Sequence, residues 1–273
     1  MVQSDLPEAL ALSELAGWPH RLRDWKLLFE IGEGRAVLVD GKIVGVGMRW
    51  LWGQYEASLG LVVVHPKWRG RGLGKQLLQA LCEGLASRAT RMHVALPVPD
   101  WAAALGFAQV GEITRFEGKA VQPPLVALPD GARLRPAGRK DLPLLAELDA
   151  RATGMTRERM LQTWLPGALG AVVLDHRDGA QGFAMMRRFG RGAVIGPVVA
   201  PCEDTARALV AHLAALADGR FLRLDVVAGP DLREWITGLG LEETGRTAVL
   251  LRGDRGVRPS HCCCVVLADE TLG

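Results

Sequence analysis

The chain has 273 residues, 49% of them apolar, which is enough to build a sizeable core in one large domain or two ordinary ones. Its 33 basic residues nearly balance 30 acidic ones, so the net charge of +3 indicates neither a nucleic-acid-binding nor a membrane-surface protein. No apolar run is long enough to span a bilayer, and the start, with Asp5 and Glu8, lacks the basic residues of a signal peptide. Five cysteines do not form a disulfide framework, so we expect a reduced, cytoplasmic protein.

The first part of the chain predicts helices and strands in mixed order. Helices are predicted at residues 6–15, 21–31 and 100–105. Strands are predicted at residues 35–39, 42–48, 55–64, 92–96 and 108–116. Asp5 and Pro7 give the first helix a start signal, Asp40-Gly41 favours a tight hairpin turn, and Asp100 is the expected N-cap of the short helix.

A short basic turn joins strand 55–64 to a further helix, in which leucines recur at helical spacing. Glycines and basic residues share this turn: Arg69, Gly70, Arg71, Gly72, Gly74 and Lys75. The first N–H groups of a helix have no internal partners and lie at the positive end of its dipole. Glycines let the backbone approach a ligand closely, and basic side chains add charge-assisted donors. The turn therefore predicts a pyrophosphate site, the alternative being a solvated turn before an ordinary surface helix.

Two common phosphate-binding loops do not match. A Walker A loop has Ser or Thr after its lysine, whereas Lys75 is followed by Gln76, and the three glycines are too closely spaced for G-x-G-x-x-G. The segment instead resembles the signature of the GNAT acetyltransferase superfamily, (Arg/Gln)-x-x-Gly-x-(Gly/Ala). Arg69, Gly72 and Gly74 stand at its fixed positions, after a strand that ends in Val-His-Pro.

The resemblance extends over roughly residues 6–117 and implies an acetyl-CoA site. In this family the loop binds the pyrophosphate, and the preceding strand binds the pantetheine arm through its backbone. An N–H of Val62 or Val63 is then expected to polarise the acetyl carbonyl. The implied acetyl-CoA-binding residues are Val62, Val63, Val64, Arg69, Gly70, Arg71, Gly72, Leu73, Gly74 and Lys75.

The same resemblance implies direct attack of an amine on the thioester, so that the enzyme positions both substrates and moves protons. The usual general acid of the family is a tyrosine four residues before a Gly-Phe pair. Here the pair is Gly106-Phe107 and Ala102, which cannot donate a proton, stands at that position. Tyr55, the only tyrosine, is the first alternative donor, with His93, His65 and water as further ones.

Carboxylates on or just before the central strand commonly serve as the general base in the family, which makes Glu56 the candidate base. The alternative is a surface glutamate at a strand start. His65 is expected to face the loop rather than take part in catalysis. Tryptophans lie on segments that flank the acceptor cleft in this fold and would suit an aromatic amine, unless they are ordinary core residues: Trp18, Trp25, Trp50 and Trp52.

The second part of the chain repeats the first. Asp5-Leu6-Pro7 recurs 136 residues later as Asp141-Leu142-Pro143, and Leu59-Gly60 recurs at the same offset as Ile195-Gly196. Near the end, Trp101 and Gly106 match Trp235 and Gly240 at an offset of 134. Matches at a nearly constant offset predict two similar domains in tandem. We therefore expect an α/β fold with a mixed sheet in each of two GNAT-like domains, at 1–120 and 132–253, with a linker at 121–131 and a tail at 254–273.

The two copies differ at the loop. About four residues are missing in the second copy, no glycine remains there, and Glu203 and Asp204 stand at the helix start. Two carboxylates suit a helix N-terminus but repel a pyrophosphate. The second domain is therefore expected to keep the fold without the acetyl-CoA site, as a wall of the acceptor pocket or as a structural partner and homodimer surface.

Two features of the tail give further expectations. Val265-Val266-Leu267 is expected to replace the missing first strand at the edge of the first domain. His261-Cys262-Cys263-Cys264 lacks the C-x₂₋₄-C spacing of structural zinc sites, so no metal is expected.

These observations predict an acetyl-CoA-dependent N-acetyltransferase that acts on a primary amine of a small molecule, with no nucleic-acid or membrane partner. The first alternative is a CoA-responsive binding or regulatory protein without turnover, suggested by Ala102 and the altered second loop. The second is a nucleotide-binding protein of unrelated fold.

Overall fold

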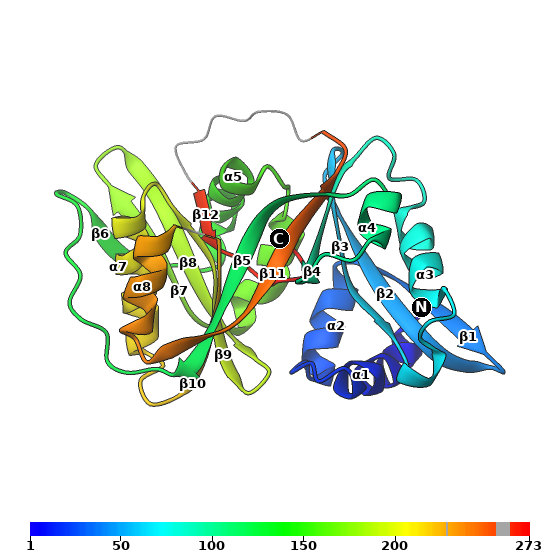
Figure 1. Cartoon of the computed structure of the whole chain (residues 1–273). Helices are drawn as coiled ribbons and strands as arrows, with labels where there is room; N and C mark the ends of the chain where they lie inside the picture. The colour runs from blue at the N-terminus through cyan, green and yellow to red at the C-terminus, as the bar shows by residue number, and fades with distance from the viewer. Residues whose placement is uncertain (228, 255–262) are drawn as a thin grey trace. The chain divides into compact units, whose positions relative to one another are not determined.

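The computed structural model describes residues 1–227, 229–254 and 263–273, and Figure 1 labels its elements. The chain divides into two compact units. Met1–Gly111 forms the first unit together with the end of β11 from Ala248 and with Leu272, and Glu112–Thr247 forms the second together with most of the C-terminal segment. The units differ from the consecutive ranges 1–120 and 132–253, because β5 (Ala108–Lys119) and β11 (Leu241–Arg252) each contribute one end to each unit.

The first unit is a mixed sheet covered by helices on both faces. Its strands pair in the order β1-β2-β3-β4, followed by the end of β11 and the start of β5. The other elements are η1 (Gln3–Asp5), α1 (Leu6–Leu15), α2 (Leu22–Glu30), β1 (Glu33–Val39), β2 (Lys42–Trp52), β3 (Glu56–Val64), η2 (Pro66–Trp68), α3 (Leu73–Cys82), β4 (Ala89–Ala95) and α4 (Trp101–Ala104). Strand β3 is antiparallel to β2 and parallel to β4, which makes it the central strand of the unit.

Alternation along β2 explains the two helical layers. Trp50 Nε1 donates a hydrogen bond to the Leu28 carbonyl oxygen at the end of α2, 3.0 Å away. On the other face, Gly45 and Gly47 leave room for Leu77 and Leu81 of α3, since a Cβ at Gly47 would lie 2.8 Å from Leu81. The predicted hairpin turn is confirmed: Asp40 and Gly41 have φ of 50° and 74°, as a type I′ turn requires.

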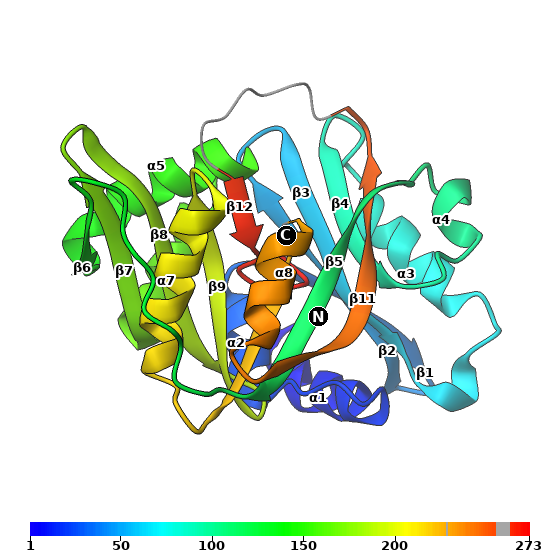
Figure 2. The same ribbon diagram turned by 60° about the vertical axis from the view of Figure 1, so that its left-hand side comes forward.

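The second unit is also a mixed sheet with helices packed on it (Figure 2). Its strands follow the order β6-β7-β8-β9-β12-β10, and β10 pairs in turn with β5. The elements are β6 (Arg133–Pro136), η3 (Arg139–Asp141), α5 (Leu142–Thr153), α6 (Glu158–Trp164), η4 (Leu165–Gly167), β7 (Ala168–His176), β8 (Gly179–Phe189), β9 (Gly192–Ala200), α7 (Glu203–Ala215), β10 (Phe221–Val226), α8 (Pro230–Thr237) and β12 (Cys263–Val266). Leu209 and Leu213 of α7 and Leu232 and Ile236 of α8 are fully buried in its core.

The repeat seen in the sequence appears as repeated local structure. Val2 N donates to Asp5 Oδ2 at 2.8 Å ahead of α1, and Gly138 N donates to Asp141 Oδ2 at 2.8 Å ahead of α5. The glycines after α4 and α8, Gly106 and Gly240, both have φ of 79°. The predicted mixed α/β fold in two similar parts is therefore confirmed.

The expectation for the tail is wrong. Val265 and Val266 do form a strand, β12, but this strand pairs with β9 and β10 of the second unit instead of the edge of the first. The apolar pattern identified a buried strand, but not the strands that it would pair with.

Candidate active site

The first feature of the site is a gap between two parallel strands. β3 and β4 pair from Glu56↔Ala89 to Leu59↔Met92 and no further. Immediately beyond, β3 contains a β-bulge, in which two residues, Leu61 and Val62, stand opposite Gly47 of β2. Leu61 has a φ of +53°, a value that leucine rarely adopts and that nothing in the sequence indicates. The bulge bends β3 where its pairing with β4 ends.

The backbone past the bulge presents hydrogen-bonding groups to this gap. His65 N donates to the Val44 carbonyl oxygen of β2 at 2.8 Å. Successive residues of a strand point their N–H and C=O groups to opposite sides. The backbone groups of Val64 and Val62 therefore point away from β2. A hydrogen bond supports this direction, because the Val64 carbonyl oxygen accepts from Arg69 Nε at 3.0 Å instead of from β2. Alternation thus favours Val62 over Val63 as the N–H donor in the gap.

The backbone conformation of the loop after β3 requires glycine at two of its three glycine positions. Gly70 and Gly72 have φ of +75° and +79°, and no atom lies within 4 Å of the position of a Cβ at either residue. Gly74 has no such φ, and its nearest neighbour is Val64 Cγ2 at 3.9 Å. His65 closes the start of the loop, since its Nδ1 accepts from Lys67 N at 3.2 Å. The loop is therefore open on its outer side, as binding of a large anion requires.

The loop leads into the positive end of a helix. Gly72 is the N-cap of α3, and Gln76 N donates to its carbonyl oxygen at 3.0 Å. The N–H groups of residues 73–75 come before this first helical hydrogen bond and are the unpaired donors of a helix start. From Ala57 to Cys82 the sequence has no acidic residue and four exposed basic ones: Lys67, Arg69, Arg71 and Lys75. Arg71 is held over the Trp68 ring, with Cζ 4.5 Å from its centroid. These donors and charges suit a phosphate group.

The structure places the predicted catalytic residues away from the bulge. Glu56 is the first residue of β3 and only 2% exposed, whereas Tyr55 lies in the turn before it and is 67% exposed. Five residues of strand put Glu56 about 16 Å from Leu61. His93 lies closer, one residue past the last paired position of β4, and is half-buried. Its neighbours Met92 and Val94 pack on the α3 side, so alternation turns His93 to the opposite face.

The position of the usual family tyrosine is buried. Ala102 is 1% exposed and packs with Phe107 and Leu78 in the core beneath α3 and α4. Asp100 is the N-cap residue of α4, as predicted, but its side chain makes no capping hydrogen bond. Its φ and ψ, −57° and −29°, are already helical.

Three of the tryptophans are core residues with satisfied N–H groups. Trp25 Nε1 donates to Ser13 Oγ, Trp50 Nε1 to the Leu28 carbonyl oxygen and Trp52 Nε1 to Ser58 Oγ. All three are at most 3% exposed. They therefore stabilise the fold, and Trp18, which is half-buried, is the one left of the four that can reach a ligand.

The described connection between β9 and α7 in the second unit has no counterpart of the loop. Only two residues separate the end of β9 at Ala200 from the start of α7 at Glu203. Glu203 Oε1 accepts a hydrogen bond from Gly229 N at 3.1 Å, which places a carboxylate at this helix start. This geometry agrees with the loss of the loop predicted from the sequence.

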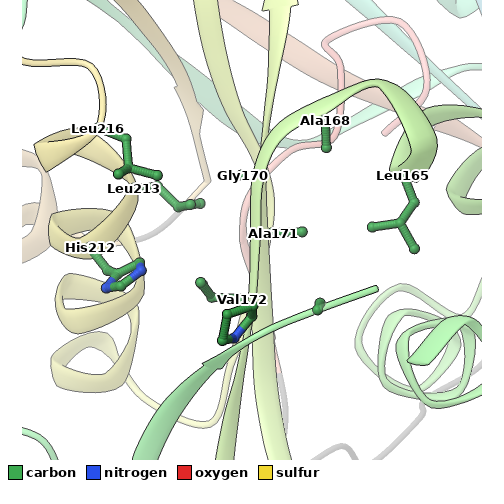
Figure 3. Close-up of a pocket in the computed structure, with 10 residues that line it drawn as sticks. Leu165, Ala168, Gly170, Ala171, Val172, His212, Leu213 and Leu216 are labelled. Carbon is green, nitrogen blue, oxygen red and sulfur yellow. The ribbon is translucent and has the colours of Figure 1, made fainter. Parts of the chain in front are cut away.

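A cavity of about 300 Å³ lies elsewhere in the second unit (Figure 3). His212 and Leu213 of α7 and Leu216 just after it line the cavity on one side. Gly170 of β7 makes room, because a Cβ there would lie 3.0 Å from Leu213 Cδ2. Apart from His212, the residues that line it have apolar side chains or none. Within the described ranges, no set of three His, Cys, Asp or Glu side chains is arranged to hold a metal ion. His261 and Cys262 lie outside these ranges. In the same part of the chain, no helix is long and apolar enough to cross a membrane.

Comparison with known proteins identifies the family of the chain. Two models of the acetyltransferase (GNAT) domain match the chain, one at residues 33–109 and the other at residues 145–261. An uncharacterized N-acetyltransferase from Bacillus subtilis (strain 168), YitH, is 27% identical over 224 residues, which are 80% of this chain and 77% of the relative.

Solved structures show the same fold. A putative acetyltransferase from Pyrococcus horikoshii superposes with a TM-score of 0.74 at 17% identity, covering 100% of this chain and 94% of that one. A tandem GNAT protein from the clavulanic acid biosynthesis pathway superposes with a TM-score of 0.55 at 17% identity, covering 83% and 85% of the two chains. The chain belongs to the GNAT acetyltransferase family, with two GNAT domains in tandem.

Proposed function

We propose that the protein transfers an acetyl group from acetyl-CoA to a primary amine of a small molecule, and that the first unit carries the site. The observation that carries this proposal is the loop between β3 and α3. It combines two open glycines, a free helix start and four basic side chains with no carboxylate.

The residues of the first unit fit such a donor along its length. The basic side chains Arg69, Arg71 and Lys75 and the N–H groups at the start of α3 would bind the pyrophosphate. The backbone of Val62 and Val64, which points away from β2, would bind the pantetheine arm and the acetyl carbonyl. Bound acetyl-CoA supplies a thioester that an amine can attack directly, so the main task of the chain is to align the two.

Proton transfer needs a group near the gap. We place His93 in this role, since it lies just past the paired part of β4 and faces away from α3. Glu56 stays a prediction as the base: at about 16 Å from the bulge it could act only through a chain of several water molecules. Tyr55 stays a prediction as the acid. Because it is exposed in the turn before β3, it could act as the acid only if the acceptor cleft extends to that turn.

Calorimetric titration with acetyl-CoA is the decisive experiment. We expect one molecule bound per chain, and acetyl transfer to at least one member of a panel of primary amines. Binding without turnover on any amine would favour the CoA-responsive regulatory protein, for which the buried Ala102 is the supporting observation. Two molecules per chain would mean that the second unit also binds, and no binding would refute the proposal.

A further inference from the structure

The C-terminal segment lies inside the sheet of the second unit (Figure 2). β9 and β10 pair directly at only two positions, Ala193↔Leu222 and Val194↔Arg223. Beyond these, β12 lies between them and is antiparallel to both. Val227 N donates to the Val265 carbonyl oxygen at 3.0 Å, and Leu267 N donates to the Asp225 carbonyl oxygen at 2.9 Å.

This position corresponds to the gap of the first unit. Strand β12 pairs with Val198, Val199 and Ala200, which stand 136 residues after Val62, Val63 and Val64. In the first unit β4 is the neighbour of β3, and the described residues place no strand in the gap beyond Leu59 and Met92. The repeat therefore contains the same gap twice, and in the second unit a segment of the chain itself fills it.

The second unit is shaped for this segment. A Cβ at Gly196 would lie 1.9 Å from the Leu267 carbonyl oxygen, so a residue with a side chain cannot replace this glycine while the segment is in place. Val266 and Ala268 are fully buried, and Leu267 is 5% exposed. The segment is thus packed as tightly as a core strand.

Arginine side chains bind the two carboxylates that follow this apolar stretch, Asp269 and Glu270. Arg187 Nη2 donates to Asp269 Oδ2 at 2.5 Å and to the Ala268 carbonyl oxygen at 3.2 Å. Arg223 Nη2 donates to Glu270 Oε2 at 2.8 Å, Thr247 Oγ1 donates to Glu270 Oε1 at 2.7 Å, and Arg115 pairs with the same carboxylate. Burial lowers the pKa of Arg223, but Asp225 and Glu270 more than offset this and raise it above its ordinary value.

We propose that the second unit is a peptide-binding cleft whose ligand is the C-terminal segment of the same chain, residues 263–270. Backbone pairing on both sides binds an extended apolar stretch, and the arginines select two consecutive carboxylates after it. The segment lies where, under the proposed function, the first unit receives the pantetheine arm. The second unit is then closed to acetyl-CoA by its own peptide as well as by the missing loop.

The test uses the full chain with a site-specific protease sequence inserted after Gly256. After cleavage we expect the C-terminal peptide to co-elute with the rest of the protein in gel filtration. A fluorescent synthetic peptide of residues 263–273 should then exchange into the nicked protein. The same peptide with Glu270→Gln should compete about tenfold less well, because it loses charged hydrogen bonds. A scrambled peptide of equal composition is the control.

Release of the peptide from a nicked protein that stays folded by circular dichroism, or equal competition by the scrambled peptide, would overturn the proposal. Should the nicked protein unfold, hydrogen exchange on the intact chain decides. The Glu270→Gln variant must exchange faster than the wild type at residues 198–200 and 263–267, with residues 6–15 unchanged as an internal control. Unchanged exchange at residues 198–200 and 263–267 would also overturn the proposal. These readouts do not involve acetyl-CoA, so they stand or fall separately from the proposed function.

Discussion

The Nε atom of Arg69 donates a hydrogen bond to the carbonyl oxygen of Val64 at 3.0 Å. One side chain thereby joins the last residue of β3 to the basic loop, and its charge remains at the proposed pyrophosphate site. We expect Arg69→Ala to weaken acetyl-CoA binding about tenfold or more, the effect of losing one charged hydrogen bond. Arg69→Lys, which keeps the charge without the forked geometry, should fall between Ala and the wild type. Calorimetry measures all three, and Arg191→Ala, an exposed arginine of the second unit, is the control.

Substitution of Gly72 tests the loop directly. Gly72→Asp places a carboxylate at the N-cap of α3, where the proposed ligand carries its own negative charge, and should abolish binding of acetyl-CoA. Gly41→Asp is a matched control, because Gly41 also has a positive φ, +74°, and no atom within 4 Å of a Cβ. Both variants should unfold at similar temperatures. If Gly72→Asp binds acetyl-CoA as tightly as Gly41→Asp does, the loop is not the site.

Kinetic measurements can distinguish His93 from Glu56 as the group that transfers the proton. We expect His93→Gln to lower kcat about 100-fold, the usual contribution of a general acid or base, with little change in KM for acetyl-CoA. Glu56→Gln and Tyr55→Phe should have smaller effects on kcat, because Glu56 begins β3 and Tyr55 lies in the turn before it, both far from the bulge. A larger loss from Glu56→Gln than from His93→Gln would reverse the assignment.

The helix start of the second unit gives a prediction on stability. The hydrogen bond from Gly138 N, with Arg135 nearby, lowers the pKa of Asp141 below its ordinary value despite some opposing burial. A carboxyl whose pKa is lowered by folding stabilises the fold above its unfolded pKa, near 3.9, and this contribution disappears as the pH falls through the folded pKa.

We therefore expect Asp141→Ala to lower the free energy of unfolding at pH 7 by about 1 kcal/mol, the usual net contribution of one hydrogen bond. The difference from the wild type should shrink toward pH 3. Urea unfolding at both pH values measures it, with Asp218→Ala, an exposed residue, as the control. A difference that is equal at the two pH values would show that the charge of Asp141 is not the cause.

Local features of the fold could be predicted because local chemistry determines them. Asp40-Gly41 specifies a turn with two positive φ values, and Pro7 and Pro143 fit only the first turn of a helix. The repeat at an offset of 136 residues located the second copy for the same reason. The place of the basic, glycine-rich loop between a strand and a helix could likewise be predicted from its own residues, whereas its role stays a proposal.

Non-local features could not be predicted in this way. The bulge at Leu61 depends on its pairing with Gly47, and leucine gives no indication of a positive φ. Val265 and Val266 suit any buried strand, so their place between β9 and β10 depends on residues some 40 to 70 positions earlier in the chain. The distance of Glu56 from the gap likewise depends on where β3 and β4 stop pairing.

The long strand β11 has a consequence for synthesis of the protein. Ala248 and Leu250 are fully buried and belong to the same core cluster as Leu59, Leu81 and Phe107 of the first unit. A ribosome that has made residues 1–120 has therefore not yet made all of the first unit's core. This core can close only after most of the second copy has been translated. Neither half of the chain then folds independently of the other. A deletion near residue 250 should destabilise the loop between β3 and α3, almost 200 residues away in sequence.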